Sequence, residues 1–203
     1  KINEEIIIAT IDCTGHGVPG GFMSIVANNA LNRSIKEFGL SKPNEILEKV
    51  NTLIEDSFSS SGENNEVRDG MDISLCLLKK EGEKHILYYS AANRPLWIIR
   101  NNALIEVKGD NQPIGKYEER KPFTQHEINL QKNDVIYLSS DGYADQFGGE
   151  EVKKFKTANF KRLLTGICNE NMNEQKNIIL QTHHLWKKDL EQIDDICVIG
   201  IRI

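Results

Sequence analysis

Residues 11–21 read Ile-Asp-Cys-Thr-Gly-His-Gly-Val-Pro-Gly-Gly, and they join an apolar run at 6–9 to a long amphipathic segment that starts near Phe22. The pattern predicts that Asp12 ends a buried strand and that a glycine-rich turn leads from it into a helix. Glycines let a ligand approach the backbone closely, and a helix N-terminus offers unpaired N–H groups and a positive dipole end. A carboxylate beside such a turn suggests a cation and an anion held together, although an ordinary strand-to-helix turn has the same composition.

The composition indicates one globular domain spanning residues 1–203. The chain is long enough to bury a substantial core, with 39% hydrophobic and 27% charged residues. No apolar run approaches the roughly 20 residues needed to cross a bilayer, and the first residues lack the features of a signal peptide. A net charge of −5 without a basic stripe argues against nucleic acid as a partner. Because position 1 is Lys, we expect an N-terminally truncated fragment of a longer protein.

Cysteine and histidine usage indicates no zinc site. The four cysteines form no CxxC pair and lie in mostly apolar contexts, which is typical of reduced thiols in a cytosolic protein. We therefore expect a cytoplasmic domain, while the full-length protein could be tethered to a membrane. The adjacent His183 and His184 fall in a predicted helix, where neighbouring side chains cannot face one ligand, and we expect them on a solvated face.

The hydrophobic periodicity changes along the chain from helical to alternating and back. Helices are expected at 22–38, 43–58, 159–167 and 173–190. Strands are expected at 71–78, 86–91, 96–100, 103–107, 122–128, 134–140 and 196–201. Helices and strands do not alternate as βαβ units, so the pattern predicts an α+β fold with antiparallel sheet and segregated helices.

Three aspartates lie at predicted strand ends. Asp12 is one; Asp141 follows the apolar strand at 134–140; and Asp194, with Asp195 beside it, precedes the last strand. Aspartate is depleted in strands, and an unpaired carboxylate near a core is costly. If the three met, they would repel one another unless a cation lay between them. Oxygen ligands without a Cys–His set favour Mg²⁺ or Mn²⁺, and two such ions could activate water and clamp a phosphoryl group. Spacing alone does not show that the sites converge.

Several motifs, in order along nearly the whole chain, resemble the metal-dependent type 2C serine/threonine phosphatases, and specifically the bacterial branch named for stage II sporulation protein E (SpoIIE). They are the opening stretch at 11–21, Met-Asp-Ile-Ser-Leu-Cys at 71–76, Tyr-Ser-Ala-Ala-Asn-Arg-Pro-Leu-Trp at 89–97, Gln-Pro-Ile-Gly at 112–115, Leu-Ser-Ser-Asp-Gly at 138–142, and Asp-Asp-Ile-Cys-Val at 194–198. The resemblance implies a four-layer αββα sandwich of two antiparallel β-sheets flanked by helix pairs, with a dinuclear metal centre.

The resemblance also implies the ligands of two Mn²⁺ or Mg²⁺ ions. Asp12 would bridge both ions, the backbone carbonyl of Cys13 would bind one, and Asp141 and Asp194 would complete the coordination of the second ion. Asp195 is the less favoured residue of its pair and an auxiliary candidate. Asp72 is either a further auxiliary ligand or a hydrogen-bonded structural residue.

Other site residues are carried over with alternatives open. His16 would protonate the leaving group or bind phosphate, or else stabilise the turn. Asn93 and Arg94 would contact phosphate, since arginine suits bidentate oxyanion recognition, or would have a structural role ahead of Pro95. The sequence departs from the family in lacking the usual first strand and in having Cys13 where many relatives have glycine.

The leading hypothesis is a phosphoprotein phosphatase of bacterial signalling that hydrolyses phosphoserine or phosphothreonine with a metal-activated water. Its substrate would be a phosphorylated protein, typically in this family an antagonist of an anti-sigma factor. An N-terminal sensory domain would bias the two helices that follow Asp12. The alternative is a non-catalytic interaction domain that keeps the fold. A nucleotide-binding module ranks last, because the chain has no GxxxxGK[ST] pattern.

Overall fold

The computed structural model describes residues 5–15, 17–59 and 70–203. The chain divides into two compact units, which are described separately. The first comprises residues 1–95 and 108–130, and the second comprises 96–107 and 131–203. The prediction of a single domain over residues 1–203 stays a prediction.

Unit 1 is built on an antiparallel sheet with the strand order β1-β2-β3-β7, formed by β1 (Glu5–Cys13), β2 (Gly70–Glu81), β3 (Lys84–Ala92) and β7 (His126–Leu130). The short β6 (Ile114–Gly115) pairs with the start of β2. The hairpin between β2 and β3 turns at Gly82, whose positive φ of 61° suits glycine. In the β1–β2 register Asp12 lies directly opposite Asp72.

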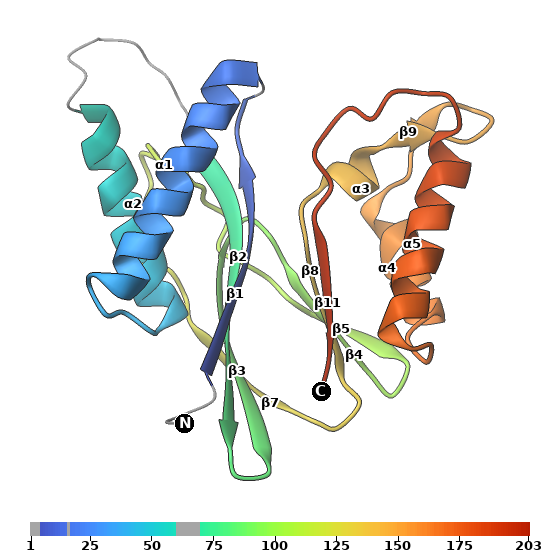
Figure 1. Ribbon diagram of the computed structural model, residues 1–203, viewed down its shortest axis with the longest axis horizontal. Helices are drawn as coiled ribbons and strands as arrows, with labels where there is room; N and C mark the ends of the chain where they lie inside the picture. Colours follow the sequence, from blue (N-terminus) through green and yellow to red (C-terminus); the bar gives the residue numbers. More distant parts are fainter. Residues whose placement is uncertain (1–4, 16, 60–69) are drawn as a thin grey trace. The chain divides into compact units, whose positions relative to one another are not determined.

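Two helices, α1 (Gly17–Lys36) and α2 (Pro43–Ser59), pack against one face of this sheet (Figure 1). Their apolar residues recur at helical spacing and bury together with alternate residues of β2. The core includes Met23 and Ala27 from α1, Leu47 and Val50 from α2, and Ile73 from the sheet. This core packs α1 and α2 on the sheet whose first strand, β1, ends just after Asp12.

Unit 2 contains a second antiparallel sheet with the order β11-β8-β4-β5, from β11 (Val198–Arg202), β8 (Val135–Ser139), β4 (Leu96–Arg100) and β5 (Ala103–Val107). The β4–β5 hairpin turns at Asn101 and Asn102, both with positive φ, as a tight two-residue turn requires. The unit also holds α3 (Gly142–Asp145), α4 (Thr157–Gly166), α5 (Met172–Lys187) and a small ribbon of β9 (Phe147–Gly148) and β10 (Lys153–Lys154).

The core of unit 2 is aromatic. Tyr143 stacks on Phe160 with ring centroids 4.2 Å apart and meets Phe155 edge-on. Trp97 of β4 makes a T-shaped contact with Phe160 at 5.6 Å. These contacts join α3, α4 and the sheet, and they position the segment that follows Asp141.

The predicted α+β class, with two antiparallel sheets and helix pairs, is confirmed. Two predicted boundaries are wrong by four or more residues. Helix α1 begins at Gly17 rather than near Phe22, because the glycines let the first turn pack tightly on the preceding loop. The strand expected at 122–128 begins only at His126, because the Phe123 and Thr124 amides donate to the Glu48 and Asp110 carboxylates instead of a neighbouring strand.

Two predictions of strand environment also need correction. Strand β1 is half-buried rather than buried, because it lies at the edge of its sheet. The last strand begins at Val198, so Asp194 lies in a loop ahead of it. The Cys197 amide donates to the Ser140 hydroxyl, which takes the place of a strand carbonyl there.

All four cysteines are free thiols. Among the described residues, none of the helices is both long enough and apolar enough to span a bilayer.

Candidate metal and phosphate site

The turn after Asp12 is tied to the start of β2. The Thr14 amide and hydroxyl both donate to the Gly70 carbonyl, at 2.9 and 3.0 Å, and the Gly70 amide lies 2.9 Å from the same hydroxyl. Gly15 then takes a φ of 89°, and a Cβ on Gly20 would lie 2.6 Å from the Gly15 carbonyl oxygen. The first turn of α1 therefore packs directly on the loop that follows β1 and Asp12, and side chains are excluded from the contact.

Asp12, Asp72 and Arg94 form one cluster in unit 1. The two aspartates are directly opposite on β1 and β2, and the same Arg94 nitrogen, Nη2, lies 3.2 Å from Asp12 Oδ2 and 2.7 Å from Asp72 Oδ2. The three side chains are only 17–21% exposed. Asn93 Nδ2 donates to Asp72 Oδ1 at 2.7 Å. The structure therefore brings together four residues that the sequence places in three separate motifs.

The backbone around Arg94 is firmly held. Asn93 has a positive φ of 61°, and its amide donates to the Asp110 carbonyl at 2.8 Å. The Arg94 amide donates to the Ala92 carbonyl, and the Tyr89 hydroxyl donates to the Arg94 carbonyl. The guanidinium is thus presented to the two carboxylates from a fixed turn.

The Cys13 side chain is not a nucleophile in this environment. Burial raises the pKa of its thiol, a hydrogen bond with Ser24 partly offsets that rise, and the neighbouring Asp12 charge adds to it. A thiol with a raised pKa stays protonated at neutral pH.

In unit 2 the loop that carries Asp194 and Asp195 is fastened next to Asp141. The Ser140 hydroxyl donates to the Asp195 carbonyl at 3.0 Å and accepts from the Cys197 amide at 2.9 Å. A Cβ on Gly142 would lie only 2.4 Å from the Asp195 carbonyl oxygen. Leu-Ser-Ser-Asp-Gly at 138–142 thus needs both its serine and its glycine to bring the two acidic segments together.

The carboxylate oxygens of these residues are suitable ligands for hard divalent cations such as Mg²⁺ and Mn²⁺. Neither unit, however, holds a complete ligand set among its described residues. Asp12 and Asp72 are paired carboxylates in unit 1, and Asp141 with Asp194 and Asp195 supplies carboxylates in unit 2. In the part of the chain that the structure describes there is no group of three or more His, Cys, Asp or Glu side chains placed to hold an ion. His16 lies outside the described residues.

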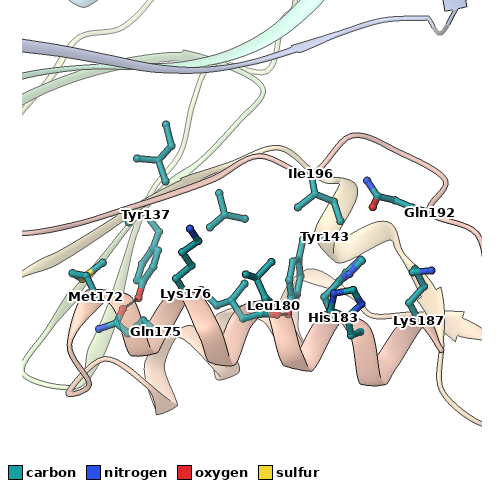
Figure 2. A pocket seen from close by; sticks show the side chains of 15 residues that line it. Tyr137, Tyr143, Met172, Gln175, Lys176, Leu180, His183, Lys187, Gln192 and Ile196 are labelled. Carbon is teal, nitrogen blue, oxygen red and sulfur yellow. Dashed lines mark hydrogen bonds between the residues drawn. The ribbon is translucent and has the colours of Figure 1, made fainter.

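Unit 2 also has a groove of about 690 Å³ between α5 and β11, lined mainly by apolar side chains such as Met172, Leu180 and Ile196 (Figure 2). None of the candidate metal ligands lines it. Tyr137 donates to Gln175 at one end, and burial raises its pKa to about 12. We therefore do not place the candidate metal and phosphate site in this groove.

His183 lines the same groove, so the prediction of a solvated face is wrong for this residue, whereas His184 is exposed. His183 is 9% exposed, and its ring lies 5.4 Å from that of Tyr143. Burial, together with His184 and Lys187, lowers its pKa.

Solved structures share this fold over nearly the whole chain. The SiaA-PP2C domain of Pseudomonas aeruginosa aligns with a TM-score of 0.83 and 24% identity, covering 99% of this chain and 80% of that one. The PP2C phosphatase domain of SpoIIE from Bacillus subtilis, determined with a fragment of its regulatory domain, aligns at 0.72 with 18% identity, covering 98% of this chain and 55% of that one. The PPM Ser-Thr phosphatase MsPP of Mycobacterium smegmatis, in complex with cacodylate, aligns at 0.61 with 13% identity, covering 99% and 92%.

These structures show that the chain has the fold of the PP2C, or PPM, phosphatase domains. No curated protein matches the sequence. The model of the Stage II sporulation protein E (SpoIIE) family matches residues 3–203, and the chain belongs to that family.

Proposed function

We propose that this chain is a metal-dependent phosphoprotein phosphatase that hydrolyses phosphoserine or phosphothreonine. The observation that carries the proposal is the pairing of Asp12 with Asp72 at the end of β1, beside a guanidinium of phosphate-binding type. Two partly buried carboxylates in direct cross-strand register repel each other, and a cation bound beside them would lower that repulsion. Membership of the SpoIIE family supports the same interpretation.

The proposed ligands of two Mn²⁺ or Mg²⁺ ions are Asp12, the Cys13 carbonyl, Asp141 and Asp194, with Asp72 and Asp195 as auxiliary ligands. When bound, such ions supply a water of lowered pKa and neutralise charge on a phosphoryl group. The chain's contribution is to hold the ligands rigid. The Thr14–Gly70 bonds fix the Asp12 turn, and the Ser140–Asp195 bond fixes the loop of unit 2.

Asn93 and Arg94 are the proposed phosphate-binding residues. The planar guanidinium matches two phosphoryl oxygens at once, and its turn is fixed by the Asn93, Arg94 and Tyr89 hydrogen bonds described above. His16 is proposed to protonate the departing serine or threonine oxygen or to bind phosphate. A side chain with a pKa near neutral suits general acid work.

Hydrolysis of a phosphoserine peptide with and without Mn²⁺ tests the proposal. Asp12→Asn keeps the size of the side chain and removes its charge, so we expect at least about a 100-fold fall in Mn²⁺-dependent turnover, since even residues that only support metal ligands cost 10–100-fold. Asp189→Asn, a carboxylate outside the candidate site, is the matched control. Unchanged Mn²⁺-dependent turnover in Asp12→Asn would refute the proposal.

One observation favours the alternative of a non-catalytic regulatory domain. Arg94 already contacts both Asp12 and Asp72, so these two carboxylates have a counterion without a metal. Calorimetric titration with Mn²⁺ separates the two functions. Binding supports the phosphatase, and absence of binding at millimolar Mn²⁺ supports the regulatory domain.

The proposed partners are a phosphorylated protein, for which the family suggests an anti-sigma factor antagonist, and an N-terminal sensory domain in a longer protein of the cytoplasm. The related SpoIIE structure includes a fragment of a regulatory domain. A regulatory domain would act on α1, because the first turn of α1 packs on the loop that follows Asp12. Equal metal affinity of the longer protein and of this chain under every input would contradict that role.

A further inference from the structure

Arg94 serves as the counterion of two carboxylates that would otherwise repel each other. Asp12 and Asp72 are opposite residues of an antiparallel pair, and both side chains are about four-fifths buried. Like charges in this position destabilise a sheet, and partial burial reduces the screening by water. The guanidinium is always charged, and it lowers the net charge of the cluster from −2 to −1.

The guanidinium uses the same atoms that a cation would need. Nη2 contacts Oδ2 of both aspartates. A divalent ion bound to either oxygen would lie close to the guanidinium in a partly buried site, where the repulsion of the two cations is strong. The ion and the guanidinium in its present position therefore exclude each other.

Only the side chain of Arg94 has to move to relieve this conflict. Its amide and carbonyl are held by Ala92 and Tyr89, and the preceding Asn93 amide is held by Asp110. Asn93 Nδ2 stays on the other oxygen of Asp72. The long, flexible arginine side chain can rotate away from the carboxylates while its turn remains in place.

We infer that Arg94 is a built-in cation that a divalent metal must displace from Asp12 and Asp72. The inference rests on the proposed function for its metal. It adds that metal affinity is set by an exchange of cations, and that the guanidinium becomes available for an oxyanion only after the metal has bound. In the metal-free protein the phosphate-binding arginine is therefore paired with Asp12 and Asp72.

Calorimetric titration with Mn²⁺ of the whole chain tests the exchange without any measurement of turnover. Arg94→Gln should bind Mn²⁺ about tenfold or more tightly than the wild type, which corresponds to about 1.4 kcal/mol, and its metal-free form should unfold at a lower temperature. Arg94→Lys, which keeps the charge, should remain close to the wild type. Arg100→Gln, which breaks the Arg100–Asp134 pair in unit 2, should lose stability without a change in Mn²⁺ affinity.

A second measurement uses the wild type alone. The NMR resonance of the Arg94 Nε–H group should shift during a Mg²⁺ titration with the same midpoint as metal binding. Metal binding that leaves this resonance in place, or equal Mn²⁺ affinity of Arg94→Gln and wild type, overturns the exchange while leaving the metal site intact. Failure of both proteins to bind Mn²⁺ overturns the exchange together with the proposed metal site.

Discussion

The contact between Gly20 and Gly15 offers a sharp test of how α1 is coupled to the Asp12 turn. A Cβ on Gly20 would lie 2.6 Å from the Gly15 carbonyl oxygen and 3.0 Å from its carbon. Both are backbone atoms, so no side-chain rotation relieves the clash. Gly20→Ala therefore requires α1 and the turn to separate. The neighbouring Gly21 is in the same helix, and a Cβ added there would meet nothing within 4 Å.

Comparison of the two glycine-to-alanine substitutions isolates the free-energy cost of the clash between Gly20 and Gly15. Alanine gains up to about 1 kcal/mol over glycine at either position through helix propensity. Overpacking a fixed contact costs about 1–3 kcal/mol, and this cost falls only on Gly20→Ala. We therefore expect Gly21→Ala to be more stable than Gly20→Ala by about 1–3 kcal/mol, with Gly21→Ala at or above the wild type.

Urea unfolding of the three proteins measures this difference, and Mn²⁺ calorimetry measures its consequence at the site. Displacement of the turn that directly follows Asp12 and Cys13 should weaken metal binding in Gly20→Ala, and metal binding should be unchanged in Gly21→Ala. Equal stability and equal metal affinity of the two variants would refute the coupling of α1 to the site.

Two further predictions concern unit 2. The Asp134 side chain is 1% exposed and accepts hydrogen bonds from Arg100 and from the Gln131 amide. Asp134→Ala should therefore lower the free energy of unfolding by about 2–4 kcal/mol. A loss smaller than the error of urea denaturation would contradict a stabilising role of Asp134. Burial lowers the pKa of His183 in the native protein. When the pH drops below the ordinary pKa of histidine, the unfolded chain therefore takes up a proton that the native chain does not. Stability falls as the pH is lowered, until the native pKa is reached. His183→Gln should therefore lose less stability than the wild type between about pH 7.5 and 5.5, and identical pH profiles in urea denaturation would exclude this cause.

Local sequence signals predict the regular parts of the fold well. The β4–β5 hairpin follows from two asparagines between two short apolar strands, since asparagine tolerates the positive φ of a tight turn. Helix α2 follows from Pro43 at its first position and one apolar face. Such features depend on neighbours in the sequence, so a pattern of residue types is enough to recognise them.

Features that depend on distant partners do not follow from such patterns. The strand expected from residue 122 starts later because Glu48 and Asp110, far away in the sequence, bind the amides ahead of it. The partners of Arg94 follow from the register of β1 against β2, which fixes Asp12 opposite Asp72. Periodicity predicts that residues are in strands but does not give the pairing of one strand with another.

The candidate site shows the same division. Motif order predicts the family and the aspartates as metal ligands, and the family match over residues 3–203 confirms the family. The positions of Ser140 and Gly142 in the Leu-Ser-Ser-Asp-Gly motif indicate a tight turn, but not its hydrogen bonds to the Asp195 segment. The burial of His183 escapes prediction because a helix pattern with two adjacent histidines does not show which of them faces the aromatic core.

The most direct test of the central claim is anomalous diffraction at the manganese edge from crystals of this protein soaked with Mn²⁺. We predict a manganese peak in contact with the Asp12 carboxylate, with the Arg94 side chain turned away from both Asp12 and Asp72. Absence of a peak in contact with Asp12, with Arg94 still bound to the carboxylates at millimolar Mn²⁺, would contradict the account.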